Sequence, residues 1–337
     1  MSEFELINRL RRRLPASAGD SPLRRGIGDD ASVSRHAGPT ATSVDAVVEG
    51  VHFRREWSTA AQVADKAEAT ALSDLAAMAA DPGEVYVTLG LPTDTAAGWV
   101  EELVDGFVEA AGAYGVALAG GDTVASPNLF VAVTVVGRAP EGESLILRSG
   151  AAAGDLVAVT GCLGGAAAGL LLLDQQAAAQ PGAAADGAAG LSEDLRAALI
   201  ARHLAPRPLL AAGSRLRGSG VTALVDVSDG LAADISHLAE ASGVSISIDP
   251  SLVPVQEGVS EVAGSAGLEP LDLALAGGED YELAMTVPPE RLELVRQRIE
   301  SAGCRLTVVG EAGPGDGISL VGAGGDSSPP AGFDHFR

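Results

Sequence analysis

Residues 58–91, STAAQVADKAEATALSDLAAMAADPGEVYVTLGL, place a helical pattern directly before a strand pattern. Ser58 can cap an alanine-rich helix that runs to about residue 80, because apolar side chains recur there at helical spacing. Residues 84–91 alternate like a strand, and Pro92 ends it. The stretch therefore predicts a domain built from both helices and strands.

The same two patterns continue on both sides of this stretch. They predict strands at 40–48, 116–119, 129–137, 155–160, 221–226, 244–249, 281–287 and 304–311. They predict helices at 3–13, up to about 113, and near 164–174, 193–217, 230–242 and 289–302. Strands and helices do not alternate strictly, so we predict an α+β fold for each domain rather than a doubly wound sheet.

The length of 337 residues predicts two domains. The stretch Arg138–Gly150 is typical of a connector, so we divide the chain into residues 1–140 and 141–337. Residues 175–191, QQAAAQPGAAADGAAGL, are of low complexity and predict a flexible surface insertion.

Composition excludes several classes of protein. Hydrophobic residues make up 47% of the chain, which is a globular composition, and the formal net charge of −23 argues against a nucleic-acid partner. Cys162 and Cys304 are far apart, which fits a reducing cytoplasm without disulfides or a zinc site. Residues 156–173 carry no charge, but their four glycines and alternating valines favour a buried strand, turn and helix over a membrane span.

Common nucleotide-binding motifs are absent or out of context. Residues 26–31, GIGDDA, fit the dinucleotide-binding glycine pattern, yet no strand precedes them and no helix follows. Two carboxylates inside that loop would also repel a pyrophosphate. The chain contains no Gly-Lys pair, so it has no Walker A loop.

A set of acidic residues stands out because each lies at a predicted strand end, turn or helix start, without Arg or Lys beside it. Its members are Asp29, Asp30, Asp45, Asp74, Asp122, Asp226 and Asp229. Any one of them alone is more simply a turn or cap residue. Together they indicate oxygen ligands for divalent cations, because unpartnered buried carboxylates are costly.

Several of these acids adjoin glycines. Gly120-Gly121-Asp122 follows an apolar strand, Asp226-Val227-Ser228-Asp229-Gly230 joins a strand to a helix, and Gly277-Gly278-Glu279-Asp280 precedes a strand. Glycine lets the backbone approach a phosphate, and an adjacent acid can hold its metal ion. This pattern favours phosphoryl transfer, which depends on positioning and charge neutralisation.

In order along the chain, these motifs resemble those of the thiamine-monophosphate kinase family, within the aminoimidazole-ribonucleotide-synthetase-like superfamily. The resemblance covers nearly the whole chain. It rests on GIGDDA (26–31), SVDAVVEGVHF (43–53), KAEATALSDLAAMAADP (66–82), GGDT (120–123), RSG (148–150), GDLVAVTGCLGGAAAGL (154–170), DVSDGLAADISHLAEASG (226–243), GGEDYEL (277–283) and GFDHF (332–336).

The resemblance implies ATP-dependent phosphorylation of thiamine monophosphate to thiamine diphosphate, by direct in-line transfer assisted by several Mg²⁺ ions. It implies two α/β domains, the N-terminal one binding metal and ATP and pairing its sheet into a barrel across a homodimer, the C-terminal one closing the active site. It implies a cytoplasmic enzyme with no membrane partner.

The resemblance also assigns residues. The implied metal ligands are Asp30, Ser43, Val44, Asp45, Asp74, Asp122, Asp226 and Asp229, with Asp74 and Asp229 the most critical. The implied ATP contacts are Tyr114, Gly121, Asp122, Arg148 and Ser228. The implied contacts to the thiamine portion are His52, Glu279 and Phe333.

Plainer roles remain open for some of these residues. His52 is also consistent with a core or surface histidine, Tyr114 with a core position, Arg148 with a surface arginine, and Phe333 with an anchor for the C-terminal tail. Val44 stands where the family often has Thr, so that ligand is lost or supplied by the backbone.

Two alternative functions also remain open. One is another ATP-dependent enzyme of the superfamily. Selenophosphate synthetase would carry a reactive Cys near the N-terminus, the hydrogenase-maturation relative would end in Cys, and aminoimidazole ribonucleotide synthetase would show another glycine pattern; here the first Cys is Cys162 and the last residue is Arg337. The other is a non-catalytic protein that binds divalent metal.

Overall fold

A computed structural model describes residues 12–13, 23–27, 31–178, 188, 190–322 and 327–333. These residues form two compact units. Unit 1 holds the described residues up to Leu75 together with Ala80–Leu145, and unit 2 holds Ala76–Ala79 and the described residues from Ile146 onward. The passage from unit 1 to unit 2 after Leu145 falls inside the stretch that we predict as a connector.

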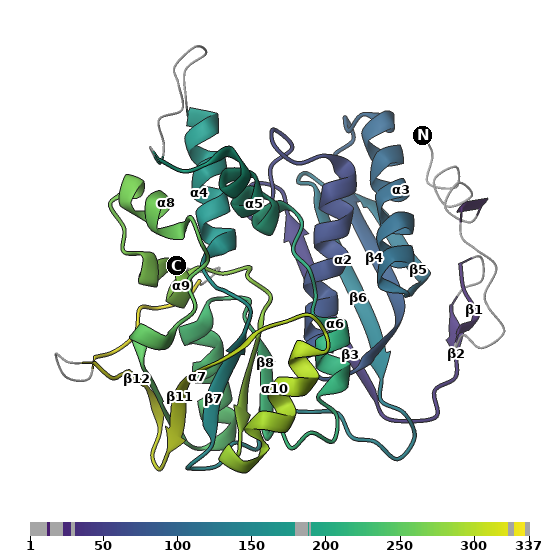
Figure 1. Cartoon of the computed structure of the whole chain (residues 1–337). Coiled ribbons are helices and arrows are strands. Elements are labelled where there is room, and N and C mark those ends of the chain that lie inside the picture. The colour runs from purple at the N-terminus through teal and green to yellow at the C-terminus, as the bar shows by residue number, and fades with distance from the viewer. Residues whose placement is uncertain are drawn as a thin grey trace. The chain divides into compact units, whose positions relative to one another are not determined.

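Unit 1 contains a four-stranded sheet in the order β3-β6-β4-β5, with helices α2 and α3 on it (Figure 1). β3–β6 and β6–β4 are antiparallel, and β4–β5 is parallel. The bounds are β3 Thr40–Val48, α2 Ala60–Ala77, β4 Asp81–Leu91, α3 Ala97–Tyr114, β5 Ala117–Ala125 and β6 Phe130–Arg138. The predictions of these elements from residue periodicity are confirmed with shifts of a few residues at their ends, except that β5 extends six residues beyond the predicted strand 116–119.

The two faces of this sheet differ in polarity. Alternate β6 residues Val131, Val133 and Val135 are fully buried, and the Leu75 side chain of α2 approaches the same strand at Gly137. On the opposite face the β3 residue Val44 is 66% exposed. The sheet therefore has one face covered by helices and one face that is open along β3, as expected from alternation.

Gly120-Gly121-Asp122 lies inside a strand, which corrects the predicted turn. β5 continues through these residues and pairs with Tyr86–Thr88 of β4. A Cβ atom at position 121 would lie 2.0 Å from the Val87 carbonyl oxygen, so glycine permits the two backbones to run side by side. Long-range pairing, which the local sequence does not reveal, replaces the turn.

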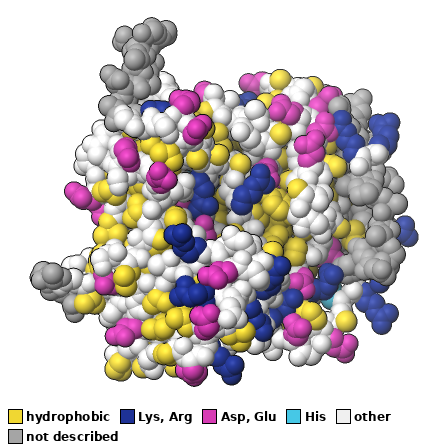
Figure 2. All heavy atoms as spheres, in the orientation of Figure 1, with side chains coloured by type: hydrophobic (Ala, Val, Ile, Leu, Met, Phe, Trp, Pro, Cys, Tyr) yellow, Lys and Arg dark blue, Asp and Glu magenta, His cyan; other side chains and the backbone are white. Residues whose placement is uncertain are grey.

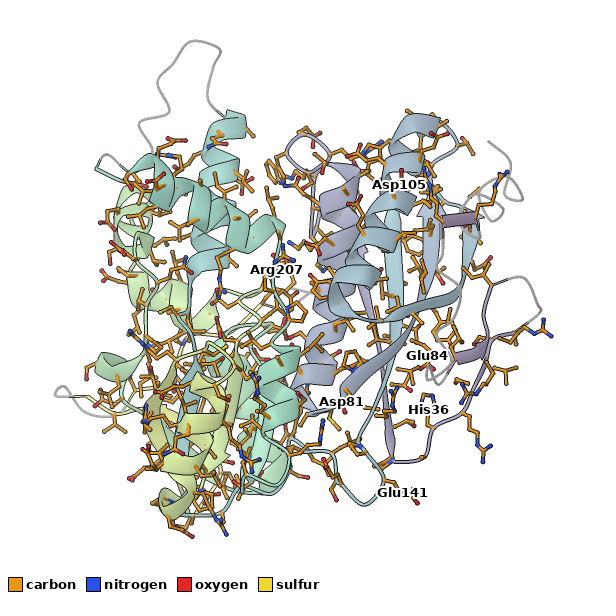
Figure 3. All side chains as sticks on the ribbon, turned by 45° about the vertical axis from the view of Figure 1, so that its right-hand side comes forward. His36, Asp81, Glu84, Asp105, Glu141 and Arg207 are labelled. Carbon is orange, nitrogen blue, oxygen red and sulfur yellow. The ribbon has the colours of Figure 1, made fainter. Side chains whose placement is uncertain are left out.

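A short hairpin joins the N-terminal region to this sheet. Strands β1 (Leu23–Arg25) and β2 (Val33–Ser34) pair with each other. The Ser32 hydroxyl lies 2.7 Å from the Tyr86 hydroxyl, and His36 Nε2 lies 3.5 Å from the buried Glu84 carboxylate (Figure 3). Burial raises the pKa of Glu84, and the nearby His36 and Arg138 oppose that rise. The segment after the GIGDDA motif is thus attached to β4.

Unit 2 contains a six-stranded sheet in the order β12-β9-β11-β7-β10-β8, in which only β12 and β9 are parallel. Its strands are β7 Leu156–Thr160, β8 Ala223–Asp226, β9 Ser245–Ile248, β10 Leu283–Val287, β11 Leu306–Gly313 and β12 Gly317–Leu320. Its helices are α4 Gly165–Ala178, α5 Glu193–Leu204, α6 Leu210–Arg215, α7 Leu231–Ser242, α8 Val259–Ala266, α9 Pro270–Ala276 and α10 Leu292–Glu300, with short turns η1 Pro250–Leu252 and η2 Pro289–Arg291.

Both faces of this second sheet are buried. Val157 and Val159 of β7 join a core with α7, whereas Ala158 joins a core with α6, α10 and the residues Ala76–Ala79. A third cluster joins α4, α5 and α8. A mostly antiparallel sheet between helical layers, together with the mixed sheet of unit 1, agrees with the predicted α+β content.

Some predictions for unit 2 need correction. Helices α8 and α9 and strand β12 were not predicted. Helix α4 runs to Ala178, so the first four residues of the predicted insertion 175–191 are helical, and Ala188 is buried in the third cluster. Residues 179–187 lie outside the described part of the chain.

Two further predictions concern the N-terminus and the membrane. Of the predicted helix 3–13, only Arg12 and Arg13 are described, and both are helical. Within the described residues, no helix has the length and apolar character needed to span a bilayer.

Acidic side chains are spread over the face in Figure 2, with arginines between them.

Candidate active site

Three segments that are far apart in sequence meet in unit 2. The amide of Glu279 donates to the Ser228 carbonyl oxygen at 2.8 Å, and the amide of Phe333 donates to the Asp229 carbonyl oxygen at 3.1 Å. The structure therefore brings together four residues that the sequence resemblance selected, namely Ser228, Asp229, Glu279 and Phe333. Phe333 is 52% exposed, so its ring is accessible.

Two glycines allow these segments to approach one another. A Cβ atom at Gly278 would lie 2.6 Å from the Ser228 carbonyl oxygen. Gly230 has a φ of 111°, which favours glycine, and a Cβ atom there would lie 2.8 Å from the Leu275 carbonyl oxygen. The glycines next to the acids therefore serve backbone packing in addition to any contact with phosphate.

Asp226 and Asp234 lie beneath this loop. Asp226 ends β8 and is buried, and Asp234 lies in the first turn of α7. Asp234 Oδ2 accepts the amides of Ser228 at 3.0 Å and Asp229 at 3.1 Å. Burial and the charge of Asp226 raise the pKa of Asp234 to about 8, against the lowering effect of the two amides. Asp234 thus braces the loop that the predicted ligand Asp229 occupies.

The donor set of this loop fits magnesium. Asp226 and Asp229 are hard oxygen donors, and both lie close enough to Asp234 for their charges to raise its pKa. Such repulsion is relieved when a divalent cation binds between carboxylates. Within the described residues, no three His, Cys, Asp or Glu side chains form a ready-made metal site.

Arg148 lies in an exposed loop that Ser242 braces. The Ser242 hydroxyl accepts the amides of Gly150 and Ala151 at 3.2 Å each and donates to the Arg148 carbonyl oxygen at 3.3 Å. The backbone at Arg148 is therefore restrained, whereas its guanidinium is exposed to solvent and accessible to an anion.

In unit 1, the structure brings Ser43 and Asp74 into contact. The Ser43 hydroxyl of β3 donates to the Asp74 carboxylate of α2. Asp45 lies two residues further along β3, so its side chain is on the same face of the sheet as Ser43. Val44 points to the open face, so any ligand from this position is its backbone.

Asp122 is separated from that group within unit 1. β5 and β3 are the two edges of the sheet, with β6 and β4 between them. Asp122 pairs with Thr88, whereas Asp45 pairs with Val133, and the pairing registers place the two aspartates on opposite faces. Gly121 lies beside Asp122 on the same strand.

His52 is anchored in a tight turn after β3. Its Nδ1 accepts the Val48 amide at 3.1 Å, so Nε2 carries the proton of the neutral ring. Its carbonyl oxygen accepts from the ammonium group of Lys66 at 2.9 Å. Lys66 is the single lysine of the chain and is only 2% exposed, and sequence reasoning gave it no role.

Tyr114 lies at the end of α3 and donates its hydroxyl to Asp65 at 2.7 Å. Its ring is only half-buried. One turn further along α2, Glu68 is fully buried, and neither of its carboxylate oxygens has a hydrogen-bond partner. Burial, with a smaller effect from Asp65, raises the pKa of Glu68 to about 9.

Asp30 lies outside the described residues, so its role as a metal ligand stays a prediction. The remaining predicted residues divide by unit. Unit 1 holds Ser43, Val44, Asp45, His52, Asp74, Tyr114, Gly121 and Asp122, and unit 2 holds Arg148, Asp226, Ser228, Asp229, Glu279 and Phe333.

Comparison with known protein families also divides the chain into an N-terminal and a C-terminal domain. Residues 28–139 match the AIR synthase related protein N-terminal domain, and residues 152–323 match the AIR synthase related protein C-terminal domain. The thiamine-monophosphate kinase of Mycobacterium tuberculosis is 38% identical over 287 residues, which cover 84% of this chain and 80% of the relative. That of Escherichia coli K12 is 36% identical over 344 residues, which cover 99% and 98%.

This chain belongs to the thiamine-monophosphate kinase family.

Solved structures agree with this membership. The thiamine-monophosphate kinase of Stenotrophomonas maltophilia K279a superposes with a TM-score of 0.79 and 35% identity, covering 95% of this chain and 96% of the other. AaThiL complexed with AMPPCP and TMP superposes with a TM-score of 0.76 and 30% identity, covering 99% and 97%. E. coli HypE, a hydrogenase maturation protein, shares the fold at 22% identity and a TM-score of 0.75.

Several residues that support this loop cluster were not identified from the sequence. Asp234 lies within the DVSDG motif region, but only its contacts show that it braces the loop. Arg202 and His203 contact Glu282 and Glu279 of the GGEDYEL motif from a helix more than seventy residues away. Neither pattern nor spacing marks them, because their contacts depend on the tertiary fold.

Proposed function

We propose that this chain is an ATP-dependent kinase that phosphorylates thiamine monophosphate to thiamine diphosphate, with ADP as the second product. Its membership in the thiamine-monophosphate kinase family over most of its length supports this activity. A protein of similar fold, AaThiL, has been solved in complex with AMPPCP and TMP, an ATP analogue together with the acceptor that we propose.

The convergence of three motifs in unit 2 is the observation that carries the proposal. Ser228, Asp229, Glu279 and Phe333 come from three distant segments that are tied together by backbone hydrogen bonds. This arrangement offers oxygen ligands, a carboxylate and an accessible aromatic ring within one loop cluster. A metal-bound phosphate and an organic ring are the two parts of the proposed acceptor that these groups suit.

We assign the phosphate end of the reaction to oxygen donors in both domains. The ligands that we propose are Asp30, Ser43, the Val44 backbone, Asp45, Asp74, Asp122, Asp226 and Asp229. When bound to them, Mg²⁺ would neutralise the charge of the two phosphate groups that must come together. The ATP contacts that we propose are Tyr114, Gly121, Asp122, Arg148 and Ser228.

The acceptor phosphate attacks in line, and no side chain forms a phosphoenzyme. The role of the protein is to hold the two anions in line and to exclude other acceptors. Arg148 suits this role because its guanidinium can bind phosphate oxygens in a bidentate manner while Ser242 restrains its backbone. His52, Glu279 and Phe333 hold the thiamine portion.

The two alternative functions, a protein that only binds metal and another enzyme of the superfamily, explain fewer of these residues. A protein that only binds metal would not need an accessible carboxylate and an exposed phenyl ring beside the acidic loop. Another enzyme of the superfamily would share the phosphate ligands and differ in the acceptor contacts. We therefore base the choice of acceptor on His52, Glu279 and Phe333.

We also propose that the enzyme is a cytoplasmic homodimer in which domain 1–140 dimerises through its sheet. The open sheet face supports this, because β3 exposes 66% of Val44 at the sheet edge. Light scattering after gel filtration should give a mass near twice 33.7 kDa. A monomeric mass for the wild-type protein would contradict the dimer.

A ³¹P NMR time course tests the activity. Purified protein is mixed with ATP, MgCl₂ and thiamine monophosphate, and an identical sample receives EDTA. We expect thiamine diphosphate to accumulate in step with ADP, and EDTA to stop both. ATP hydrolysis without thiamine diphosphate would mean that the acceptor assignment is wrong.

A further inference from the structure

Three acidic residues, Glu279, Asp280 and Glu282, lie within four positions directly before β10. Asp280 is 2% exposed and Glu282 is 5% exposed, whereas the Glu279 side chain keeps about a fifth of its surface accessible. Three carboxylates placed this closely repel one another, and burial makes that repulsion costly. The segment therefore needs donors from elsewhere in the fold.

The last turn of α5 supplies two of these donors, in consecutive residues. Arg202 Nη2 donates to Glu282 Oε1 at 3.1 Å and to the Asp280 carbonyl oxygen at 3.2 Å. His203 Nδ1 lies 2.9 Å from Glu279 Oε2. An ionised carboxylate only accepts, so Nδ1 of His203 carries the proton and donates it. α5 thus contacts all three acidic residues through two neighbouring side chains.

The two donors serve different carboxylates. Glu282 also accepts from the Thr160 hydroxyl at 2.6 Å, and Asp280 accepts the amides of Gly164 and Ala166. These are buried structural contacts inside unit 2. Glu279 differs, because one side of it contacts the buried His203 and the other side remains accessible to solvent.

The backbone of Glu279 adopts a strained conformation. Its φ is 67°, a left-handed value that is uncommon for a residue with a side chain, and Tyr281 has a φ of 51°. The Glu279 amide is bound to the Ser228 carbonyl oxygen at 2.8 Å. Both ends of Glu279 are therefore fixed, the backbone by Ser228 and the carboxylate by His203.

We propose that His203 is a positioning residue that holds the Glu279 carboxylate in the orientation that binds the thiamine portion of the acceptor. This inference rests on the proposed function. A glutamate side chain has several rotatable bonds, and ordering it during binding weakens affinity. A hydrogen bond from a buried imidazole orders it beforehand, so the benefit appears in acceptor binding.

Steady-state kinetics of three single variants tests this role. In His203→Ala, we expect the KM for thiamine monophosphate to rise roughly 5- to 30-fold, the range that corresponds to one or two kcal/mol, while the KM for ATP changes less than about twofold. In His203→Asn, the amide nitrogen can replace Nδ1 as the donor, so most of the affinity should return. His237→Ala removes an exposed histidine of α7 and should behave as wild type.

A double-mutant comparison separates positioning from folding. If His203 acts through Glu279, His203→Ala should add less than about twofold to the KM of Glu279→Gln. Equal increases in the KM for ATP and for thiamine monophosphate, or an unchanged KM in a folded His203→Ala, would overturn the inference. If His203→Ala does not fold, His203→Phe, which fills the buried site without a donor, replaces it alone and in the Glu279→Gln background, and the same outcomes decide.

The wild-type control distinguishes the two possible failures. A wild-type protein that neither binds nor phosphorylates thiamine monophosphate contradicts the proposed function, and the role of His203 falls with it. A wild-type protein that is active, combined with variants that keep its KM, contradicts the role of His203 alone.

Discussion

The acids of unit 2 and those of unit 1 are held in place in different ways. In unit 2, Asp234 accepts the backbone amides of Ser228 and Asp229, and Glu279 is bound to both Ser228 and His203. In unit 1, Asp45 and Asp122 each accept from the amide of the next residue along the chain. Contacts between distant segments restrain a loop more than contacts between neighbours.

This difference suggests that the two units contribute differently to catalysis. The loop of unit 2 is ordered before any ligand binds, so it should determine geometry and acceptor recognition. Asp45 and Asp122 have local restraints, so their placement should depend more on the bound metal and nucleotide. Asp74 is intermediate, because the Ser43 hydroxyl from another element contacts it.

Removing a proposed metal ligand from either unit should have the largest effect. We expect Asp74→Asn and Asp229→Asn each to lower kcat more than about 100-fold while the melting temperature stays within a few degrees, because the charge is lost but the shape is kept. Kinetics at saturating substrates and thermal melting measure the two quantities. Asp316→Asn, on an exposed turn, is the control. Retention of most activity in both variants would remove the metal assignment.

Replacing Asp234, which holds the loop, should lower activity less than replacing the proposed metal ligand Asp229. Asp234→Ala leaves the amides of Ser228 and Asp229 without their partner, which should lower kcat about 10- to 100-fold and cost about 1–3 kcal/mol of stability. Asp234→Asn keeps an accepting oxygen and should recover much of the activity. A similar loss of kcat in both would mean that the charge of Asp234, and not its hydrogen bonds, matters.

A buried acid in unit 1 should make stability depend on pH. The pKa of Glu68 is raised from 4.5 to about 9. Its contribution to stability is therefore fully present below pH ~4.5 and is lost as pH rises towards 9, by at most about 1.4 kcal/mol per pH unit. In Glu68→Gln this slope should disappear, and the melting temperature at pH 8 should exceed that of wild type. Melting curves between pH 5 and 9 test it, and parallel curves for both proteins would show that Glu68 is not buried.

The fold could be predicted where local pattern and tertiary structure agree. Strand 40–48 alternates because one face of β3 is covered and the other is open, and the structure gives the same bounds. The prediction for Gly120-Gly121-Asp122 was wrong because this composition is typical of a turn, whereas pairing with β4 makes the segment part of a strand. Helices α8 and α9 have eight and seven residues, which is too short for a clear helical period.

The functional residues, too, could be predicted from the sequence only where the local pattern was sufficient. The acids next to glycines could be found because the residue type and its neighbours carry the chemistry. Their supporting residues could not, because Asp234, Arg202 and His203 act through contacts that only the folded chain creates. A histidine at the end of a helix looks ordinary in sequence until the residue opposite it is known.

The smallest predicted effect concerns the tail of unit 2. The Phe333 amide is bound to the Asp229 carbonyl oxygen, and its ring is 52% exposed, so the backbone is anchored while the ring is accessible. Replacing the ring keeps the backbone bond, so Phe333→Ala should raise the KM for thiamine monophosphate about fivefold and leave the KM for ATP nearly unchanged. Phe333→Tyr keeps an aromatic face and should behave almost as wild type. Equal effects on both substrates would mean that Phe333 anchors the tail and does not stack on the acceptor, and the loop of unit 2 would then recognise the thiamine portion through Glu279 alone.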